Sequence, residues 1–219
     1  MTSKRATATQ MISSERVSAI IRTDDQVLAA DAMQAAVEGG MRIVEFTCTT
    51  PGVFELISQF ARRDGVLVGA GTVMTVELAS QAVAAGAGFL VSPITDLSVI
   101  DAAHELDVAC IPGAYTPTEM ETAHRAGADF IKVFPAPAGG VGFIRSLRGP
   151  LPHHRLFPTA GPTPENFLEY LDAGCAGVGF VRSLFAPEDL VAKRFDAIRL
   201  RASGIIERVA AWRANRSPD

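Results

Sequence analysis

The chain has 219 residues, which suits one domain, since even a closed α/β barrel needs about 200–250 residues. Hydrophobic residues make up 48% of the chain and charged residues 20%, a composition that excludes a disordered chain and can fill a core without disulfide bonds. The 20 Lys and Arg residues against 24 Asp and Glu residues give a net charge of −4. No block of like charge occurs, so we expect no general binding to nucleic acids or anionic membranes.

The number and spacing of the cysteines indicate the redox environment of the protein. Cys48, Cys110 and Cys175 are odd in number, lie far apart and include no CxxC pair, so we expect reduced thiols in a cytoplasmic protein and no zinc site. No apolar run reaches about 18 residues, and the basic start has no apolar segment behind it. A membrane span and a secretory signal are therefore not expected.

Eight short apolar segments, rich in β-branched and aromatic residues, are predicted to be strands. They begin near Val17, Arg42, Val66, Phe89, Val108, Phe130, Leu156 and Gly177. Only residues 1–9 and 215–219 look loose, so a single domain is expected over residues 10–214.

Amphipathic, Ala-rich stretches between the strands are predicted to be helices. They include residues 29–38, 76–85, 97–106, 118–126 and 164–173. Thr118 and Glu121 have the spacing of a capping box, and Pro164 suits a first helical turn. Glycines at 39–40, 86, 127 and 174 follow predicted helices, where a helix commonly ends on a residue in the left-handed backbone conformation.

The alternation of strands and helices predicts a parallel sheet, and eight strands are the number that closes a (β/α)8 barrel. An open doubly wound sheet is the alternative. A dinucleotide-binding sheet is disfavoured because GAGTV at 69–73 lacks the third glycine of that fingerprint and does not lie in the first βα unit.

Lys132 is the most informative residue of the chain. It is one of three lysines and is bracketed by Phe130, Ile131, Val133 and Phe134 in a predicted buried strand. Desolvation should lower its pKa, and a neutral amine is the form that attacks a ketone to make a Schiff base.

Glu45 is the matching carboxylate in the second predicted strand. Strand alternation puts Glu45 on one face with Ile43 and Thr47, as it puts Lys132 with Phe130 and Phe134. If both faces point inward, Glu45 can relay protons beside Lys132. The alternative is a buried Glu–Lys–Arg salt network that only holds the barrel together.

Other chemistries have little support. His104, His124, His153 and His154 show no HxH or HExxH spacing, so we expect no metal site. The GxSxG elbow and the GxxxxGK[ST] phosphate loop are both absent.

Several blocks in order make residues 17–189 resemble the 2-keto-3-deoxy-6-phosphogluconate / 2-keto-3-deoxy-6-phosphogalactonate aldolase family (KDPG/KHG aldolases). The blocks are Ala19-Ile-Ile-Arg22, Val44-Glu45, Thr49-Thr50-Pro51, Gly69-Ala-Gly-Thr-Val73, Ser92-Pro93, Ile111-Pro-Gly113, Ile131-Lys-Val-Phe-Pro135, Pro158-Thr159 and Asp172-Ala-Gly-Cys-Ala-Gly177. The resemblance implies a metal-free class I aldolase on a (β/α)8 barrel, commonly a homotrimer. Such enzymes need no cofactor and cleave a 2-keto-3-deoxy sugar acid to pyruvate and an aldehyde.

The resemblance also implies roles for individual residues. Lys132 matches the Schiff-base lysine and Glu45 the general acid/base. Thr72 matches a residue that binds the keto-acid carboxylate, and Pro93 and Phe134 match the lining of the pyruvate pocket. The further substrate-binding positions that it implies are Arg22, Thr47, Thr49, Thr159, Gly161, Gly179 and Arg182.

Two departures bear on the substrate. Thr49 stands where phosphogluconate-type members carry an arginine, and its Thr-Thr-Pro is more similar to the phosphogalactonate branch. The glycines expected at the phosphate loops are replaced in Ala160-Gly161 and Val181-Arg182; Val181 would hinder a backbone phosphate nest, whereas Arg182 either clamps an anion or faces solvent. A 6-phosphorylated sugar acid is the main expectation, with an unphosphorylated keto acid such as 4-hydroxy-2-oxoglutarate as the alternative.

Two readings outside aldol chemistry stay open at this point. One is a phosphate-site isomerase or decarboxylase on the same barrel, in which Lys132 acts only electrostatically. The other is a catalytically idle barrel that binds or assembles.

Overall fold

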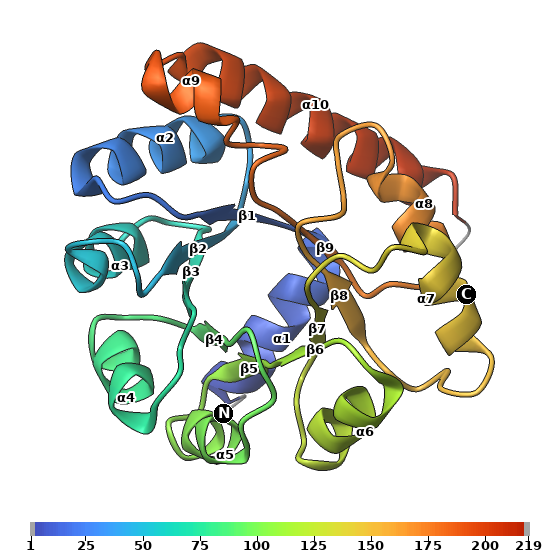
Figure 1. Cartoon of the computed structure of the whole chain (residues 1–219). Coiled ribbons are helices and arrows are strands. Elements are labelled where there is room, and N and C mark those ends of the chain that lie inside the picture. The colour runs from blue at the N-terminus through green and yellow to red at the C-terminus, as the bar shows by residue number, and fades with distance from the viewer. Residues whose placement is uncertain (1–2, 217–219) are drawn as a thin grey trace.

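The protein is a ring of parallel strands surrounded by helices, described here from a computed structural model for residues 3–216 (Figure 1). The strands are β1 (Val17–Ile21), β2 (Ile43–Thr47), β3 (Leu67–Gly71), β4 (Phe89–Val91), β5 (Ala109–Ile111), β6 (Gly113–Ala114), β7 (Ile131–Val133), β8 (Leu156–Pro158) and β9 (Val178–Phe180). The helices are α1 (Lys4–Glu15), α2 (Gln26–Glu38), α3 (Val53–Ala61), α4 (Val76–Ala84), α5 (Leu97–Glu105), α6 (Pro117–Arg125), α7 (Gly140–Arg148), α8 (Phe167–Asp172), α9 (Pro187–Val191) and α10 (Phe195–Ala214). All eight predicted apolar segments contain strands.

The ring is built from two parallel sheets. One has the order β5-β4-β3-β2-β1-β9 and the other β6-β7-β8. They meet at a bridge between Thr159 and Gly179 and at the bond from Lys132 N–H to the Pro112 carbonyl (2.8 Å). Pro112 has no N–H and interrupts the fifth predicted segment, which therefore forms β5 and β6. The (β/α)8 barrel is confirmed, and the open sheet is excluded.

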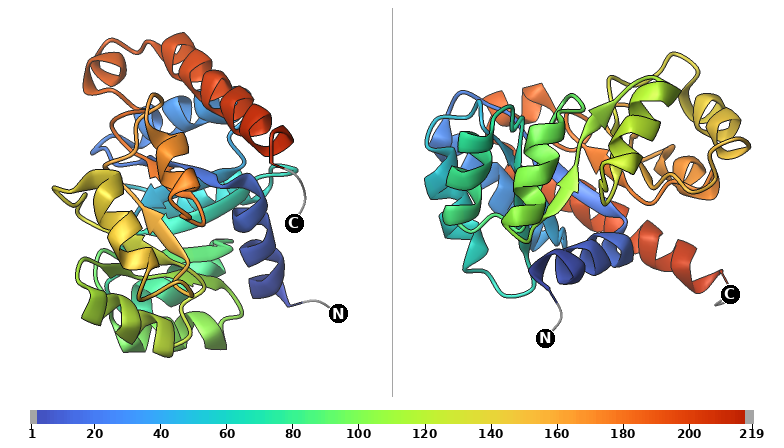
Figure 2. Two further views of the ribbon diagram at one scale, coloured as in Figure 1. Left: turned by 90° about the vertical axis from the view of Figure 1, so that its right-hand side faces the viewer. Right: turned by 90° about the horizontal axis from the view of Figure 1, so that it is seen from below.

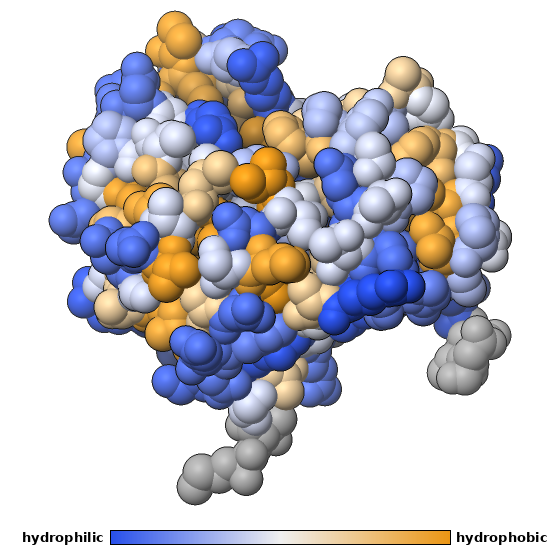
Figure 3. All heavy atoms as spheres, turned by 60° about the horizontal axis from the view of Figure 1, so that its bottom comes forward, coloured by the Kyte–Doolittle hydropathy of each residue, from blue (hydrophilic) through white to orange (hydrophobic). Residues whose placement is uncertain are grey.

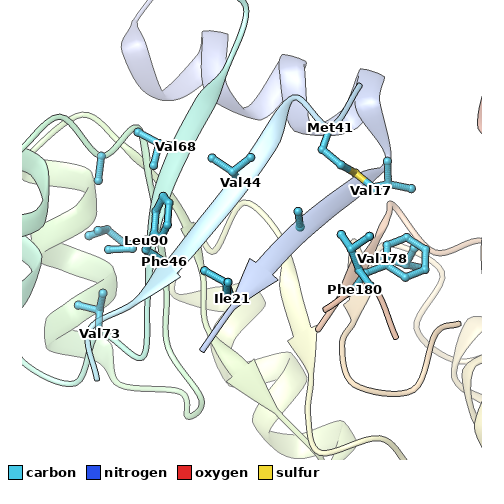
Figure 4. Packing of buried hydrophobic residues seen from close by; sticks show 14 of the residues in the cluster. Val17, Ile21, Met41, Val44, Phe46, Val68, Val73, Leu90, Val178 and Phe180 are labelled. Carbon is cyan, nitrogen blue, oxygen red and sulfur yellow. The ribbon is translucent and has the colours of Figure 1, made fainter. Parts of the chain in front are cut away.

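Two apolar clusters lie on the two faces of the strands. The larger one, which includes Val44 and Phe46, packs between the strands and the outer helices (Figure 4). The smaller one fills the barrel interior and joins Ile43 and Phe130 to Ile12 of α1. Figure 2 shows α1 crossing one end of the barrel. That end is closed by α1, so a substrate enters from the other end.

The N-terminal segment differs from the sequence-based expectation. The predicted loose segment 1–9 is wrong from Lys4 onward, where α1 begins behind the Ser3 cap, whose hydroxyl accepts from Ala6 N–H (3.0 Å). Only Ala8 and Ile12 of α1 are buried, so the helix carries too weak an apolar period to be seen in the sequence. Residues 1–2 and 217–219 of the two predicted loose ends lie outside the described residues.

Two helix starts also need correction. The capping box of α6 is Thr116 with Glu119, two residues earlier than the predicted pair, because Pro117 sets the first helical residue. The carboxylate of Glu119 accepts from Thr116 N–H (2.8 Å), and Glu121 is left for other contacts. Helix α8 begins only at Phe167, so Pro164 stands in the preceding turn.

The predicted glycine stops are confirmed. Gly40, Gly86, Gly127 and Gly174 all have positive φ angles between a helix and the next strand. None of the helices described in residues 3–216 combines the length and apolar character that crossing a bilayer requires.

Candidate active site

Lys132 and Glu45 lie inside the barrel. Lys132 comes from the middle of β7 and Glu45 from the middle of β2, and they are 8% and 2% exposed. Both line one interior cavity with Ile43 and Phe157, and Ile12 closes its far side. The inward orientation that strand alternation predicted for both side chains is confirmed.

Burial disfavours the charged form of both groups. Desolvation lowers the pKa of Lys132, with Arg22 acting in the same direction and Glu45 opposing it. Desolvation also raises the pKa of Glu45, and this effect exceeds the opposing influence of Lys132 and Arg22. The pair therefore favours a neutral amine beside a protonated carboxyl, which are a nucleophile and a proton donor.

No salt network occupies this interior. Within the described residues neither Lys132 nor Glu45 forms an ion pair within 4.0 Å, and Glu45 Oε1 has no hydrogen-bond partner. The third member of the supposed network, Arg22, donates to threonines instead. The Glu–Lys–Arg alternative is thus reduced to charge interactions at longer range, since Lys132 and Arg22 still act on the pKa of Glu45. A buried carboxylate oxygen without a partner is typical of a functional site.

Gly71 makes room for the Glu45 carboxylate. A Cβ atom at Gly71 would lie 1.9 Å from Glu45 Oε1. The two residues are on neighbouring strands, where Glu45 pairs with Gly69 and Thr47 with Gly71. Gly71 of the GAGTV block thus leaves space for the Glu45 carboxylate, whereas Gly69 leaves space for the Phe89 ring.

A row of hydroxyl groups and one guanidinium lies at the carboxyl ends of β1, β2 and β3. Arg22 donates from Nη1 to Thr49 Oγ1 (3.0 Å) and from Nη2 to Thr72 Oγ1 (2.9 Å). Thr47 Oγ1 lies 3.1 Å from Thr49 Oγ1 and 3.3 Å from Thr50 Oγ1. Thr72 has a φ of 58°, in the left-handed region. This row places a fork of donors at the open end of the barrel, above Glu45.

Phe134 contacts Lys132, whereas Pro93 packs against Gly113. Lys132 Nζ lies 4.9 Å from the Phe134 ring centroid, so this aromatic face contacts the amine directly. Pro93 belongs to the loop after β4, and its carbonyl packs where a Cβ at Gly113 would lie (2.3 Å). That close approach explains the glycine of the Ile-Pro-Gly block.

A second, more open cavity adjoins the first. It is lined by Arg22, Ala160, Val181 and Arg182, among others, so the loops after β8 and β9 meet the Arg22 side chain there. Arg182 is exposed and forms no ion pair within residues 3–216. The interpretation of Val181-Arg182 as an anion-binding loop stays a prediction.

Three further predicted site residues are Thr159, Gly161 and Gly179. Thr159 is buried at the same interior cavity as Lys132, and its Oγ1 has no hydrogen-bond partner among residues 3–216. Gly179 lies in β9, where a Cβ would collide with Thr159 Cγ2 (2.5 Å), so its position makes room for Thr159. Gly161 lies between Ala160 and Pro162, which both line the open cavity, but is not itself part of the lining.

Ser18 is a site residue that the sequence analysis missed. It is buried in β1 and lines the interior cavity with Lys132 and Glu45. Its signal was a polar residue at alternate spacing with Ile20 inside a predicted barrel strand, where a hydroxyl is as unusual as a charge.

Comparisons with known proteins agree with this geometry. The profile of the family described as "KDPG and KHG aldolase" matches residues 8–200. A Treponema pallidum protein named 2-dehydro-3-deoxy-phosphogluconate aldolase is 39% identical over 142 residues, which cover 64% of this chain and 66% of the relative. The similarity covers 65% of the corresponding aldolase of Pseudoalteromonas atlantica.

Solved structures extend the likeness over nearly the whole chain. The Legionella pneumophila KDPG aldolase, solved with pyruvate captured as a covalent carbinolamine, has a TM-score of 0.81 at 26% identity and covers 90% of this chain and 97% of that one. A structure described as native KDPGal has a TM-score of 0.78 at 31% identity and covers 90% and 96%. The chain belongs to the KDPG and KHG aldolase family.

Proposed function

We propose that the protein is a class I aldolase that cleaves a 2-keto-3-deoxy sugar acid to pyruvate and an aldehyde. The observation that carries this function is that the buried Lys132 and Glu45 line one interior cavity and neither forms an ion pair within residues 3–216. Family membership supports the same reaction. A lysine that acted only electrostatically would need its charge, and burial opposes that charge.

The chemistry uses residues of this chain and no cofactor. The neutral Lys132 amine adds to the keto carbon, and loss of water from the carbinolamine gives a protonated imine. Deprotonation of the C4 hydroxyl then breaks the C3–C4 bond, the aldehyde leaves, and the bonding electrons pass to the imine nitrogen as an enamine. Protonation of C3 and hydrolysis release pyruvate and restore the amine. Glu45 gives up a proton to the departing water and exchanges protons at the later steps.

Arg22 is assigned to the substrate carboxylate. Its guanidinium donates a hydrogen bond to Thr49, at the position where phosphogluconate-type members carry an arginine, and another to Thr72 (2.9 Å). A guanidinium reaching in from β1 thus supplies the two-pronged contact that a planar carboxylate needs.

The distal end of the substrate is assigned to the open cavity at Arg182. The main substrate is a 6-phosphorylated sugar acid, because an exposed guanidinium without an ion pair in residues 3–216 can hold a phosphate there. Val181 in place of glycine favours 4-hydroxy-2-oxoglutarate as the second candidate, since a β-branched residue hinders a backbone phosphate nest.

The protein is also proposed to act as a cytoplasmic homotrimer. Its three cysteines are free thiols, as expected for a reducing compartment. Met74, Val76, Ile94 and Leu97 on the α4 and α5 side are 39–51% exposed, and apolar side chains gather in patches on the face shown in Figure 3. Light scattering should give three chains per particle.

Borohydride trapping with pyruvate tests the reaction. The full chain should gain one pyruvate-derived adduct, and peptide mapping should place it on Lys132. Lys132→Met should give no adduct, and Lys193→Ala, which removes an exposed lysine, should give the parent result. Glu45→Gln should still form the adduct while turnover falls roughly 100-fold or more. No adduct on the folded parent chain would contradict the aldolase assignment.

Substrate competition tests the distal group. Arg182→Ala should lower kcat/KM for the 6-phosphorylated substrate about 10- to 100-fold, the scale of a lost hydrogen bond to a charged group, and change 4-hydroxy-2-oxoglutarate cleavage far less. Arg199→Ala on α10 is the matched arginine control. Equal losses on both substrates would remove the phosphate role from Arg182.

A further inference from the structure

A histidine–carboxylate cluster lies outside the barrel interior, between α6 and the loop that leads from α7 to β8 (Figure 1). Glu121 of α6 meets His153 and His154 of that loop, and one ligand atom from each lies within 4.8 Å of the other two. His154 Nε2 is 2.9 Å and His153 Nε2 is 3.4 Å from Glu121 Oε2. The chemistry proposed at Lys132 uses none of these residues.

We propose that Glu121, His153 and His154 form a binding site for a divalent transition metal ion such as Zn²⁺. A tetrahedral zinc ion with ligand bonds of about 2.0–2.1 Å separates its ligands by about 3.3 Å. The two measured separations from Glu121 Oε2 bracket that value. The third separation, between the ligand atoms of His153 and His154, is within 4.8 Å, so the two rings must close around an entering ion.

The ligand groups are held ready for a cation. Arg125 Nε donates to Glu121 Oε1 (2.7 Å), which fixes the carboxylate and leaves Oε2 directed at both rings.

His154 is the anchor of the site. Its side chain is fully buried, and its Nδ1 has no hydrogen-bond partner within the described residues. Without a metal ion, Nε2–H donates to the Glu121 carboxylate, so an ion bound through Nε2 replaces this hydrogen bond and the ring keeps its proton on Nδ1.

His124 can supply a fourth ligand to the ion. It follows Glu121 by three residues on α6, and its ring centroid lies 4.7 Å from that of His153 and 5.4 Å from that of His154. A rotation of this exposed side chain gives a His3Glu set, and water can take the position otherwise. Imidazole and carboxylate ligands suit Zn²⁺, Cu²⁺ and Ni²⁺ better than Mg²⁺ or Ca²⁺.

The location gives the ion a structural role. The cluster ties α6 to the residues that enter β8, whereas substrate is assigned to the carboxyl ends of the strands. Zinc should therefore stabilise the fold and leave aldol cleavage unchanged.

Zinc titration of the full chain, made without a histidine tag, tests the site. Calorimetry should show one saturable Zn²⁺ per chain, and Co²⁺ should give the intense visible absorption of a tetrahedral site. At a Zn²⁺ concentration about 100 times Kd the Tm should rise by roughly 5–10 °C. A chelator such as EDTA should reverse the shift and leave turnover unchanged.

Matched variants identify the ligands. His153→Ala and Glu121→Gln should each weaken Zn²⁺ binding at least 10-fold; both side chains are partly exposed, so folding should survive. His104→Ala removes a histidine outside the cluster and should bind as the parent does. Cys48 is a poor competitor because burial raises its pKa to about 11. Absence of saturable binding, binding unchanged in His153→Ala, or turnover abolished by the chelator would each overturn the proposal.

Discussion

The main feature at the scale of single residues is the pair of buried ionisable side chains, Lys132 and Glu45. Lys132 and Glu45 occupy strand positions where an apolar residue would be more stable, and no ion pair offsets their burial within residues 3–216. Gly71 completes the arrangement, because only a residue without Cβ leaves space for the Glu45 carboxylate.

Gly71→Ala should slow the proton transfers assigned to Glu45 and leave the Lys132 nucleophile in place. The added Cβ must displace Glu45 Oε1, so turnover should fall about 100-fold, the scale for losing a general acid/base. Trapping of pyruvate on Lys132 should persist. Gly204→Ala is the control: nothing lies within 4 Å of its Cβ position in α10, and it should stabilise the protein by about 0.5–1 kcal/mol. Parental turnover in Gly71→Ala would show that the carboxylate position is not critical.

At the scale of elements, capping decides where α6 starts. The sequence holds two overlapping T-x-x-E patterns, and the structure uses Thr116 with Glu119. This choice leaves Glu121, two residues further along the helix, to contact His154. A local cap thus determines which carboxylate meets the histidines.

Thr116→Ala should lower the free energy of unfolding by about 1 kcal/mol, the usual loss for an N-cap. Thr118→Ala, at an exposed position inside α6, should change it by less than about 0.5 kcal/mol. Urea unfolding of the two variants measures the difference. Equal losses would mean that the cap does not lie at Thr116.

Asp189 connects α9 to α10 and to the turn after β9 through the side chains of two arginines. It accepts from Arg194 Nε and Arg201 Nη2, each at 2.7 Å, and Arg201 also donates to the Leu184 carbonyl after β9. These contacts hold α9, α10 and the turn beside Arg182 together. Hydrogen bonds from Arg201 and Arg194 lower the pKa of Asp189.

Asp189→Asn should therefore be destabilising in a pH-dependent way. A depressed carboxyl pKa stabilises the fold above the unfolded pKa of about 3.9, and the contribution disappears as the pH falls through the folded value. We expect a loss of about 2 kcal/mol near pH 7, the scale of a hydrogen bond to a charged group, and almost no difference from the parent near pH 2. A difference that does not shrink on acidification would contradict the ionic origin.

At the scale of the whole molecule, α1 closes the barrel end opposite the mouth. Ile12 is fully buried and lines the same cavity as Lys132 and Glu45. Helix α1 therefore keeps water from reaching the Lys132 amine through this end of the barrel. The substrate is expected to enter at the carboxyl ends of the strands.

Ile12→Ala should cost about 2–5 kcal/mol, the range for deleting a buried aliphatic side chain. Gln10→Ala, on the exposed side of α1, should cost less than about 0.5 kcal/mol. Thermal unfolding of both variants checks the difference. A near-neutral Ile12→Ala would mean that α1 does not plug the barrel.

The strands and the Lys132–Glu45 pair could be predicted from the sequence, because period-2 apolar segments are local and a charge inside them is conspicuous. The strand count favoured a barrel, but only the contact between the two sheets excluded an open sheet. The sequence did not determine α1, whose two buried residues are too few for a period, or the break at Pro112. The Arg22–Thr49–Thr72 contacts and the Glu121–His153–His154 cluster were decided by tertiary structure alone. Their members lie tens of residues apart, and only closure of the barrel brings the strand ends and the neighbouring outer segments together.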